Sequence, residues 1–411
     1  MKIRSITVLF DPAIDPPSQT LPVLAEFARA ASSNIQESGF EVQSLRLATS
    51  PFPSWVPDLS EHTLTTIAID YERQALEAGF SYVSLGTALP EHPASFGLIP
   101  SILAATQNVF VTGSMTAAGG KVSLEAVRAC GEIIARTANI TPDGFTNLRF
   151  AALGNVPAGS PFLPSAYHGP GMQPGVALAV ECADLVQEIF THADSLEQAR
   201  EALIFKLEEA AASLQQALST PCVEHTVQFL GIDFSPAPYP SPSCSSGSAL
   251  EALGLSRLGL SGTLAAAAFL ADTLDRGNWP RTGFNGLMLP VLEDSTLAAR
   301  AAEGSLTVKD LLMVSAVCGT GLDTIPLPGD ASPAQLAALL LDVAVLSQRL
   351  DKPLTARLMP MPGKAAGDPI QFDFEYFASG CVMALPATPL QGMLAGDDWI
   401  DIHPKSSYRL A

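Results

Sequence analysis

The stretch "TARLMPMPGKAAGDPIQF", residues 355–372, ends an apolar, strand-like run in two prolines, a glycine and a lysine. A similar phrase, "VCGTGLDTIPLPGDASP", occupies residues 317–333. Both segments stop at Pro-x-Pro-Gly followed by a charged residue. Proline fixes the backbone angle φ and reduces the entropy of the unfolded chain, so loops of this kind are stiff. The two phrases therefore indicate β-strands whose ends hold polar groups in rigid loops.

Outward from these phrases, strand-like and helical segments alternate along the chain. Strands are predicted at residues 3–10, 40–47, 80–85, 109–112, 145–155, 176–181, 225–234 and 355–360. A helix is predicted from Asp194, with Glu197 as its capping box, to about Leu218, and another from Ser332-Pro333, with Gln335, to about Leu350. Strands and helices at such short intervals imply βαβ units and a mainly parallel sheet. In such sheets the loops after the strands form the functional site.

Composition limits the classes of partner. The formal net charge of −19 argues against nucleic acids and anionic membranes, because both require a basic surface. The apolar runs at 260–274 and 336–346 are too short or carry an aspartate, so they indicate buried helices. The N-terminus lacks the features of a secretory signal, and the six cysteines lack CxxC spacing, which favours a cytoplasmic protein with reduced thiols. The shortage of charge, 15% of residues, favours a homodimer that shares apolar faces.

Several phrases together carry a family resemblance. They are "GFTNLRFAAL", "SPFLPSAYH", "GIDFSPAP", "GFNGLMLPVLED", "SAVCGTGLDTIPLPGD" and "RLMPMPGKAAGDPIQF". The chain resembles the family known as domain of unknown function 711 from about residue 145 to 372, with a weaker match in its first strand. This resemblance implies one large α/β barrel of mostly parallel strands spanning residues 1–411, similar to the barrel of glycyl radical enzymes such as pyruvate formate-lyase. The absence of a charged linker or low-complexity stretch also favours a single domain.

The resemblance suggests counterparts for the cysteine and glycine loops of glycyl radical enzymes. Cys318 in "SAVCGTG" matches the first loop, and Gly363 or Gly367 the second. The chain departs from the radical signature, however, since Lys364 rather than an aromatic residue follows Gly363. Radical chemistry is therefore not predicted.

The loop after residue 360 is a candidate anion site. Arg357 and Lys364 flank it, and Gly363 allows the backbone to approach a ligand closely. A strand-ending turn with glycine at positive φ is the alternative. Arg149 and Tyr167 are further candidate substrate-binding residues, the first in a predicted strand and the second in a Gly/Pro-rich loop.

Three residues are candidates for proton transfer or nucleophilic attack. His168 lies in the same loop as Tyr167, where it could serve as general base or metal ligand, although a single histidine is more often structural. Glu181 ends the apolar run "VALAVE", where burial would raise its pKa. Its alternative role is a helix N-cap. Cys318 is a nucleophile only if a helix N-terminus or a cation lowers its pKa, so a buried inert thiol is favoured.

Carboxylates follow several predicted strands and could converge on a hard cation. Asp233, followed by the candidate substrate ligand Ser235, ends one strand, Glu293 and Asp294 follow "GLMLPVL", and Asp323 and Asp330 follow Cys318. Oxygen ligands of this kind suit magnesium, manganese or calcium. Asp323 is also a catalytic candidate. Capping of the following helices is the alternative, and no HxxxH or DxD spacing supports a metal. No organic cofactor is predicted.

These residues predict an enzyme that acts on a small anionic metabolite by lyase, isomerase or hydrolase chemistry. The alternative is a non-catalytic metabolite-binding or regulatory protein on the same fold. Titratable groups with shifted pKa values in a cavity favour the enzyme, and an uncharged cavity favours the binding protein. The spatial prediction is that one cavity is lined by Arg149, His168, Glu181, Asp233, Cys318, Asp323, Arg357 and Lys364.

Overall fold

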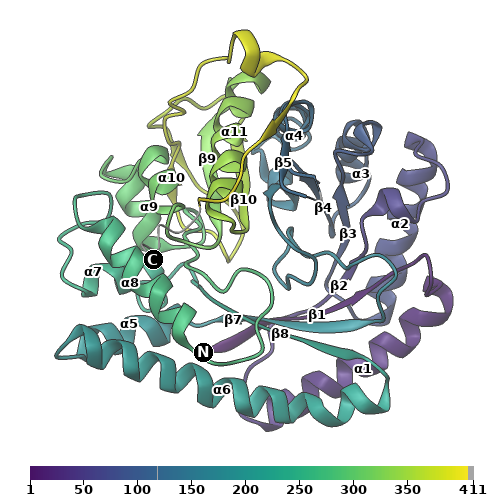
Figure 1. The fold of residues 1–411 in the computed structure, drawn as a ribbon, viewed down its shortest axis with the longest axis horizontal. Helices are drawn as coiled ribbons and strands as arrows, with labels where there is room; N and C mark the ends of the chain where they lie inside the picture. The colour runs from purple at the N-terminus through teal and green to yellow at the C-terminus, as the bar shows by residue number, and fades with distance from the viewer. Residues whose placement is uncertain (118, 406–411) are drawn as a thin grey trace, which may run out of the picture.

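A nine-stranded mixed sheet forms the centre of the protein (Figure 1). The computed structural model describes residues 1–117 and 119–405. The sheet has the order β8-β7-β1-β2-β3-β4-β6-β10-β9. Its strands are β1 (Lys2–Phe10), β2 (Leu45–Thr49), β3 (Tyr82–Ala88), β4 (Val109–Ser114), β6 (Phe150–Gly154), β7 (Gly175–Glu181), β8 (Gln228–Ala237), β9 (Gly321–Pro328) and β10 (Leu354–Met361).

The strands run in two directions. The central strands β1, β2, β3, β4 and β6 are parallel to one another. The flanking pairs β7–β8 and β10–β9 are each internally parallel but join the centre through antiparallel contacts, β1–β7 and β6–β10. The prediction of an α/β protein with a mostly parallel sheet is therefore confirmed, and the two antiparallel junctions make the sheet mixed.

The helices lie on the outside of this curved sheet (Figure 1). Helix α1 packs against α6, and α4 packs against α11. The helices are α1 (Pro17–Glu37), α2 (Glu61–Ala78), α3 (Ile99–Ala105), α4 (Leu124–Thr137), α5 (Ala183–His192), α6 (Leu196–Glu224), α7 (Ser246–Ala252), α8 (Thr263–Arg276), α9 (Ser295–Ala302), α10 (Val308–Val314) and α11 (Pro333–Leu350). In the described part of the chain, no helix is both long and apolar enough to cross a membrane.

The two Pro-x-Pro-Gly phrases lie side by side. Strands β9 and β10 are parallel neighbours, and Met359, Pro360 and Met361 pair with Pro326, Leu327 and Pro328. Beyond the strands, the Gly329 N–H donates to the Lys364 carbonyl oxygen over 3.0 Å. A Cβ at Gly329 would lie 2.1 Å from the Met361 carbonyl oxygen, so only glycine fits this close approach. The repeated phrase is thus the paired ending of two adjacent strands.

An irregular segment, residues 281–290, lies between the two outermost strands. Arg281 forms a parallel bridge with Ile232 of β8, and Pro290 forms one with Asp323 of β9. The Ile232 N–H donates to the Pro280 carbonyl oxygen over 2.8 Å, and the Val291 N–H donates to the Asp323 carbonyl oxygen over 3.0 Å. The segment therefore connects the ends of the open sheet and completes the wall around its concave side.

Two predicted helix starts have different outcomes. Helix α11 spans Pro333–Leu350 and begins with the predicted capping box of Ser332 and Gln335. The start predicted at Asp194 with Glu197 is wrong by one residue, because the Ser195 hydroxyl accepts the Gln198 N–H and Leu196 is the first helical residue. That helix also continues to Glu224, past the predicted end at Leu218.

Removing the α11 cap should have a modest, measurable effect. Ser332→Ala leaves the Gln335 N–H, which now donates to the serine oxygen over 3.3 Å, without that partner. We expect the free energy of unfolding to fall by about 1 kcal/mol in urea denaturation. Ser33→Ala is the matched control, because Ser33 is an exposed serine inside α1. If the two variants have the same free energy of unfolding, the capping role of Ser332 is contradicted.

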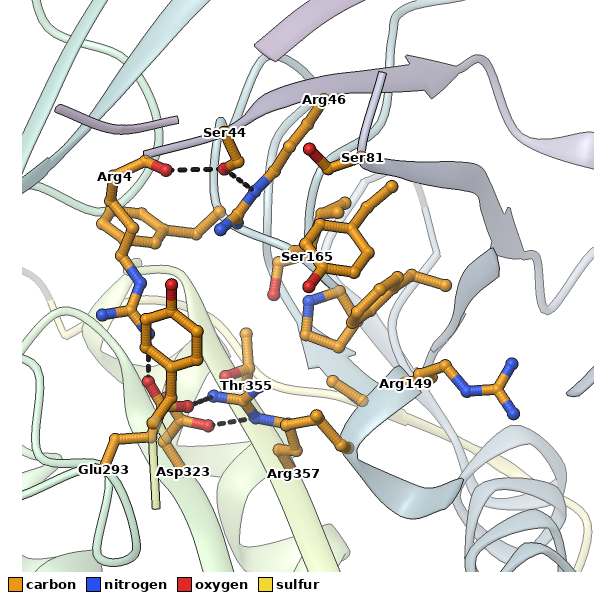
Figure 2. A pocket seen from close by; sticks show the side chains of 18 of the residues that line it. Arg4, Ser44, Arg46, Ser81, Arg149, Ser165, Glu293, Asp323, Thr355 and Arg357 are labelled. Atoms are coloured by element: carbon orange, nitrogen blue, oxygen red, sulfur yellow. Dashed lines mark hydrogen bonds and ion pairs between the residues drawn. The ribbon is translucent and has the colours of Figure 1, made fainter. Parts of the chain in front are cut away.

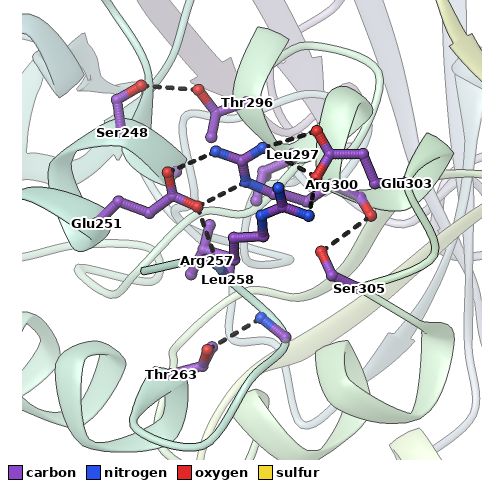
Figure 3. A network of polar contacts seen from close by, with 12 residues as sticks. Ser248, Glu251, Arg257, Leu258, Thr263, Thr296, Leu297, Arg300, Glu303 and Ser305 are labelled. Carbon is purple, nitrogen blue, oxygen red and sulfur yellow. Dashed lines mark hydrogen bonds and ion pairs between the residues drawn. The ribbon is translucent and has the colours of Figure 1, made fainter. Parts of the chain in front are cut away.

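A network of ion pairs joins α7 to α9 away from the sheet (Figure 3). The Arg300 guanidinium binds both carboxylate oxygens of Glu251, at 2.7 and 2.8 Å, and also binds Glu303 at 2.9 Å. The Ser248 and Thr296 hydroxyls form a further contact of 2.7 Å between the same helices. The Arg300 side chain is 20% exposed, so water screens this network in part.

Candidate functional site

A cavity of about 340 Å³ lies on the concave side of the sheet. Five neighbouring strands contribute a side chain from their first half: Arg4, Arg46, Tyr82, Phe110 and Ala151. The cavity therefore lies toward the amino-terminal ends of the central strands. The prediction that the site forms at the carboxyl ends of the parallel strands does not hold for this cavity.

A buried network of alternating charges forms one wall of the cavity (Figure 2). The Arg357 guanidinium donates to Asp323 Oδ1 at 2.5 Å and to Glu293 Oε1 at 2.6 Å. Arg4 donates to the other oxygen of Glu293, and to Glu181 at 3.3 Å. Each of these side chains is at most 12% exposed. Each of these charges therefore needs its partner, because an unpaired charge buried at this depth strongly destabilises the fold.

An irregularity in strand β9 directs Asp323 into the cavity. The pairing of β10 with β9 shifts after Ala356, so that Asp323 and Thr324 together face Arg357, as in a β-bulge. Thr324 has a positive φ of 43°, which is unfavourable for a β-branched residue. Bulges and strained backbone of this kind concentrate at functional sites, where they orient a side chain.

The two carboxylates that share Arg357 have pKa values shifted in opposite directions. Burial raises the pKa of Asp323, and the charge of Glu293 adds to that effect, so Arg357 only partly offsets it. Burial also acts on Glu293, but the charges of Arg357 and Arg4 outweigh it and hold the pKa of Glu293 below its ordinary value. One carboxylate is thus suited to take up a proton and its neighbour to stay ionised.

Arg46 is a cation without a carboxylate partner among the described residues. Its Nε donates to Ser44 Oγ over 3.0 Å, and the guanidinium lies 5.7 Å from the centre of the Tyr82 ring. Burial lowers the pKa of Arg46 to about 10, so it remains charged at neutral pH. Ser81 and Ser165 also line the cavity close to Arg46 in Figure 2. A guanidinium with hydroxyl donors beside it has the chemistry that matches an anionic group.

Aromatic side chains cover the cavity. In the segment "QFDFEYF", residues 371–377, exposed polar residues alternate with partly buried Phe372, Phe374 and Tyr376. Phe374 and Tyr376 line the cavity, and Arg4 lies 5.7 Å from the centre of the Tyr376 ring. Phe374 also packs edge-on against Phe145, with ring centres 5.1 Å apart. This cover reduces the access of water to the charged wall.

Of the eight residues predicted to share one cavity, Arg149, Asp323 and Arg357 line it. Glu181 lies behind Arg4 and holds it in place. Arg149 lines the cavity with its stem only, because its guanidinium points away in Figure 2 and donates to the carbonyl oxygens of Leu103, at 2.7 Å, and Val109, at 3.3 Å. The spatial prediction is therefore wrong for the other five residues, since the cavity is not lined by Glu181, His168, Asp233, Cys318 or Lys364.

His168 lies at the other end of the sheet. Its backbone N–H donates to the carbonyl oxygen of Thr49, the last residue of β2, and its Nε2 contacts the Gln173 carbonyl oxygen at 3.0 Å. Burial lowers the pKa of His168, so it is neutral at physiological pH. The Tyr167 hydroxyl donates to the Val156 carbonyl oxygen at 2.6 Å, which makes it part of the loop structure.

Asp233 and Ser235 organise a loop instead of facing the cavity. Asp233 Oδ1 accepts the N–H groups of Ser235 and Asn285, each at 2.9 Å, and Oδ2 accepts the N–H of Phe284 at 2.7 Å. The Ser235 hydroxyl donates to Asp233 at 2.6 Å and accepts the Gly286 N–H at 3.1 Å. Together they attach the segment 281–290 to β8.

The remaining predicted residues lie outside the cavity. Cys318 is a buried thiol in the turn before β9. Asp330, Gly363 and Lys364 are exposed, and Lys364 Nζ donates to the Pro369 carbonyl oxygen at 2.9 Å. The described residues contain no group of three or more His, Cys, Asp or Glu side chains arranged to hold a metal ion, so Asp233, Asp323 and Asp330 do not converge.

Sequence reasoning missed Arg4, Arg46 and Tyr376, and it considered Glu293 only as a carboxylate that could converge on a cation or cap a helix. Arg4 and Arg46 each interrupt an apolar strand, "KIRSITVLF" and "LRLAT". A charged residue inside a buried strand needs a partner, and this signal would have identified both. Glu293 is followed by Asp294, whose side chain caps α9, so two adjacent carboxylates have different roles.

The comparisons with known proteins place the chain among uncharacterised relatives. A family model described as "Uncharacterised ACR (DUF711)" matches residues 1–375. A UPF0210 protein of Pyrobaculum islandicum is 32% identical over 398 residues, which cover 90% of this chain and 87% of that protein. A UPF0210 protein of Methanosarcina acetivorans is 28% identical over 356 residues, covering 81% and 75% respectively.

Among solved structures, the similarity is distant. An anaerobic ribonucleotide reductase matches 87% of this chain and 70% of its own, with a TM-score of 0.36 and 9% sequence identity. The enzyme of this type from Thermotoga maritima matches 83% of this chain and 67% of its own, with a TM-score of 0.33 and 10% identity.

Proposed function

The chain belongs to the DUF711 family, whose members are also called UPF0210 proteins, and we propose that it is an enzyme acting on a small anionic metabolite. Its reaction is a proton transfer of the lyase or isomerase type, carried out in the interior cavity. The observation that carries the proposal is the pair Asp323 and Glu293, two buried carboxylates on one guanidinium with pKa values shifted in opposite directions. Pairs of this kind divide acid and base roles in many active sites.

In this proposal each cavity residue has one role. Arg46, with Ser44, binds the anionic group of the metabolite. Asp323 takes or gives the proton, because its raised pKa brings it closer to neutrality than an ordinary aspartate. Glu293 and Arg357 are positioning residues that fix the Asp323 carboxylate. Phe374 and Tyr376 exclude water and so strengthen the electrostatic interactions inside.

The competing function is a non-catalytic metabolite-binding protein. An uncharged, apolar cavity would favour that alternative. This cavity is instead lined by Arg46 and Asp323, whose pKa values are both shifted by burial. A metal-assisted reaction has less support, because Asp323 and Glu293 are already bound to guanidinium groups.

Arg46→Gln tests the binding half of the proposal. The variant removes a charge-assisted contact, so affinity for an anionic ligand should fall roughly tenfold to a hundredfold. Small carboxylates and phosphates are first screened by thermal shift, and those that stabilise the protein are measured by calorimetry. Arg73→Gln is the matched control, since it removes an exposed arginine of α2 far from the cavity. If both variants lose the same affinity for the ligand, the effect comes from net charge alone.

Proton exchange tests the catalytic half. Each ligand that binds is incubated with the enzyme in D₂O and followed by proton NMR, where catalysis of proton abstraction appears as loss of a C–H signal next to a carbonyl or carboxylate. We expect exchange for at least one ligand. Tight binding without exchange for any ligand would favour the non-catalytic protein.

A further inference from the structure

The charges around the cavity are unevenly distributed. The paired network contains three carboxylates, Glu181, Glu293 and Asp323, and two guanidinium groups, Arg4 and Arg357. When all are ionised, this network carries one negative charge in excess. The positive charge that balances it is on Arg46, with which the network shares no ion pair in the described part of the chain. These six side chains together sum to zero and form two poles. Arg149 is not counted, because it lines the cavity with its stem only and its guanidinium donates to the Leu103 and Val109 carbonyl oxygens.

The positive pole has unused donors. Arg46 uses its Nε for Ser44, and no protein acceptor is found among the described residues for its two terminal nitrogens. Ser44 is itself fixed, because its hydroxyl donates to the Arg4 carbonyl oxygen at 2.7 Å. A planar guanidinium with free terminal nitrogens matches a carboxylate or phosphate group.

The negative pole has an unused acceptor. Asp323 Oδ1 accepts from Arg357, whereas Oδ2 has no hydrogen-bond donor among the described residues. Both oxygens of the neighbouring Glu293 accept from a guanidinium. The Asp323 side chain is 11% exposed and lines the cavity, so Oδ2 is the carboxylate atom that a ligand can reach.

We propose that the ligand of this cavity is a bipolar molecule, with a carboxylate or phosphate bound by Arg46 and an amino group bound by Asp323 Oδ2. This inference rests on the proposed function, whose binding site it specifies. A bipolar ligand leaves the buried cavity neutral, whereas a plain anion adds an uncompensated charge to a site with low dielectric constant. Phe110, Phe162, Leu148 and Met288 also line the cavity and provide an apolar wall for a hydrocarbon or aromatic body. The amino acid class satisfies all three requirements.

A matched ligand panel tests the inference by calorimetry on the full-length protein. The pairs differ only in the amino group: 4-aminobutanoate with butanoate, 5-aminopentanoate with pentanoate, and phenylalanine with 3-phenylpropanoate. Glutarate and succinate represent ligands with two negative ends. At least one amino compound should bind roughly tenfold or more tightly than its partner without the amino group.

Two variants assign the preference to its residue. Asp323→Asn keeps the shape of the side chain and an oxygen for Arg357 but removes the negative charge, so the preference for the amino compound should disappear while carboxylate binding remains. Asp330→Asn, at an exposed aspartate outside the cavity, should leave the preference unchanged. Circular dichroism confirms that both variants are folded.

The outcomes separate this inference from the function on which it rests. If the carboxylates without an amino group, or the dicarboxylates, bind as tightly as the amino acids, and Arg46→Gln weakens them, the bipolar ligand is refuted and the anion-binding enzyme stands. If an amino acid binds but Asp323→Asn retains the full preference, the assignment to Asp323 is refuted. If no compound of the ligand panel binds and the wider anion screen is also negative, the bipolar ligand and the proposed function are both refuted.

Discussion

Arg357→Met should lower the free energy of unfolding by about 3–5 kcal/mol, measured by urea denaturation at pH 7. The variant leaves Asp323 without its guanidinium and Glu293 with Arg4 alone, at sites where the side chains are 11% and 5% exposed. A buried charge that has lost its partner bears the full cost of desolvation. The Arg357 guanidinium is occupied by Asp323 and Glu293, so we expect it to stabilise the fold instead of binding the anion directly.

The size of this loss should depend on pH. In the wild type, Arg357 helps to keep the pKa of Glu293 below its ordinary value of 4.5, so this ionised carboxylate stabilises the fold above that pH and loses its contribution as the pH falls through the lowered value. The Arg357→Met variant lacks much of this contribution. The difference in the free energy of unfolding between wild type and variant should therefore be largest near neutrality and narrow below about pH 4.5.

Two further variants test whether the burial of Arg357 causes the large loss of stability. Arg300→Met also removes a guanidinium from two carboxylates, but the Arg300 side chain is 20% exposed (Figure 3), so the loss should be only about 1 kcal/mol. Arg357→Met combined with Asp323→Asn should be more stable than Arg357→Met alone, because it removes one unpaired charge. A double variant that is less stable than the single one would contradict this account.

Asp323→Asn should reduce proton exchange or turnover by roughly a hundredfold to ten-thousandfold, the usual contribution of a general acid or base. The amide can still accept a hydrogen bond from Arg357 but cannot take up the proton. Rates are compared at saturating ligand by proton NMR in D₂O, so that a change in affinity does not mimic a loss of catalysis.

The control for this variant is Asp330→Asn, which should keep the wild-type rate. The pH profile provides a second readout, since the acid limb of the wild-type rate should lie above the ordinary aspartate pKa of 3.8 because burial raises the pKa of Asp323. An Asp323→Asn variant that exchanges protons at the wild-type rate would remove Asp323 from the mechanism.

The local pattern of the sequence predicted the elements better than their arrangement. The capping box at Ser332 determines where α11 begins because it involves residues three apart, and such contacts are visible in the sequence. The direction of the strands depends on contacts between distant residues, such as Lys2 with Glu181. No local pattern encodes those contacts, so the two antiparallel junctions were not predicted and the site was expected at the carboxyl ends of the strands.

The same distinction explains the candidate site. Asp323 and Arg357 were predicted because they follow or interrupt apolar strands, and both line the cavity. Asp233 has the same sequence signature, yet its carboxylate is occupied by N–H groups of residues about fifty positions away. Whether a buried aspartate holds a loop or faces a ligand depends on its partners, which the sequence does not show. The bulge that orients Asp323 is likewise a product of strand pairing.

The segment 281–290 has a consequence for the behaviour of this protein in crowded solution. The outermost strands of an open sheet present unpaired backbone groups to which another chain can add as a further strand. Here the protein's own segment occupies part of both free edges, through Arg281 on β8 and Pro290 on β9. Proline, which cannot donate a backbone hydrogen bond, stands at Pro236 in β8 and at Pro326 and Pro328 in β9. Loss of this segment would therefore expose two aggregation-prone edges at once, and the prolines of the two edge strands are the remaining protection against self-association.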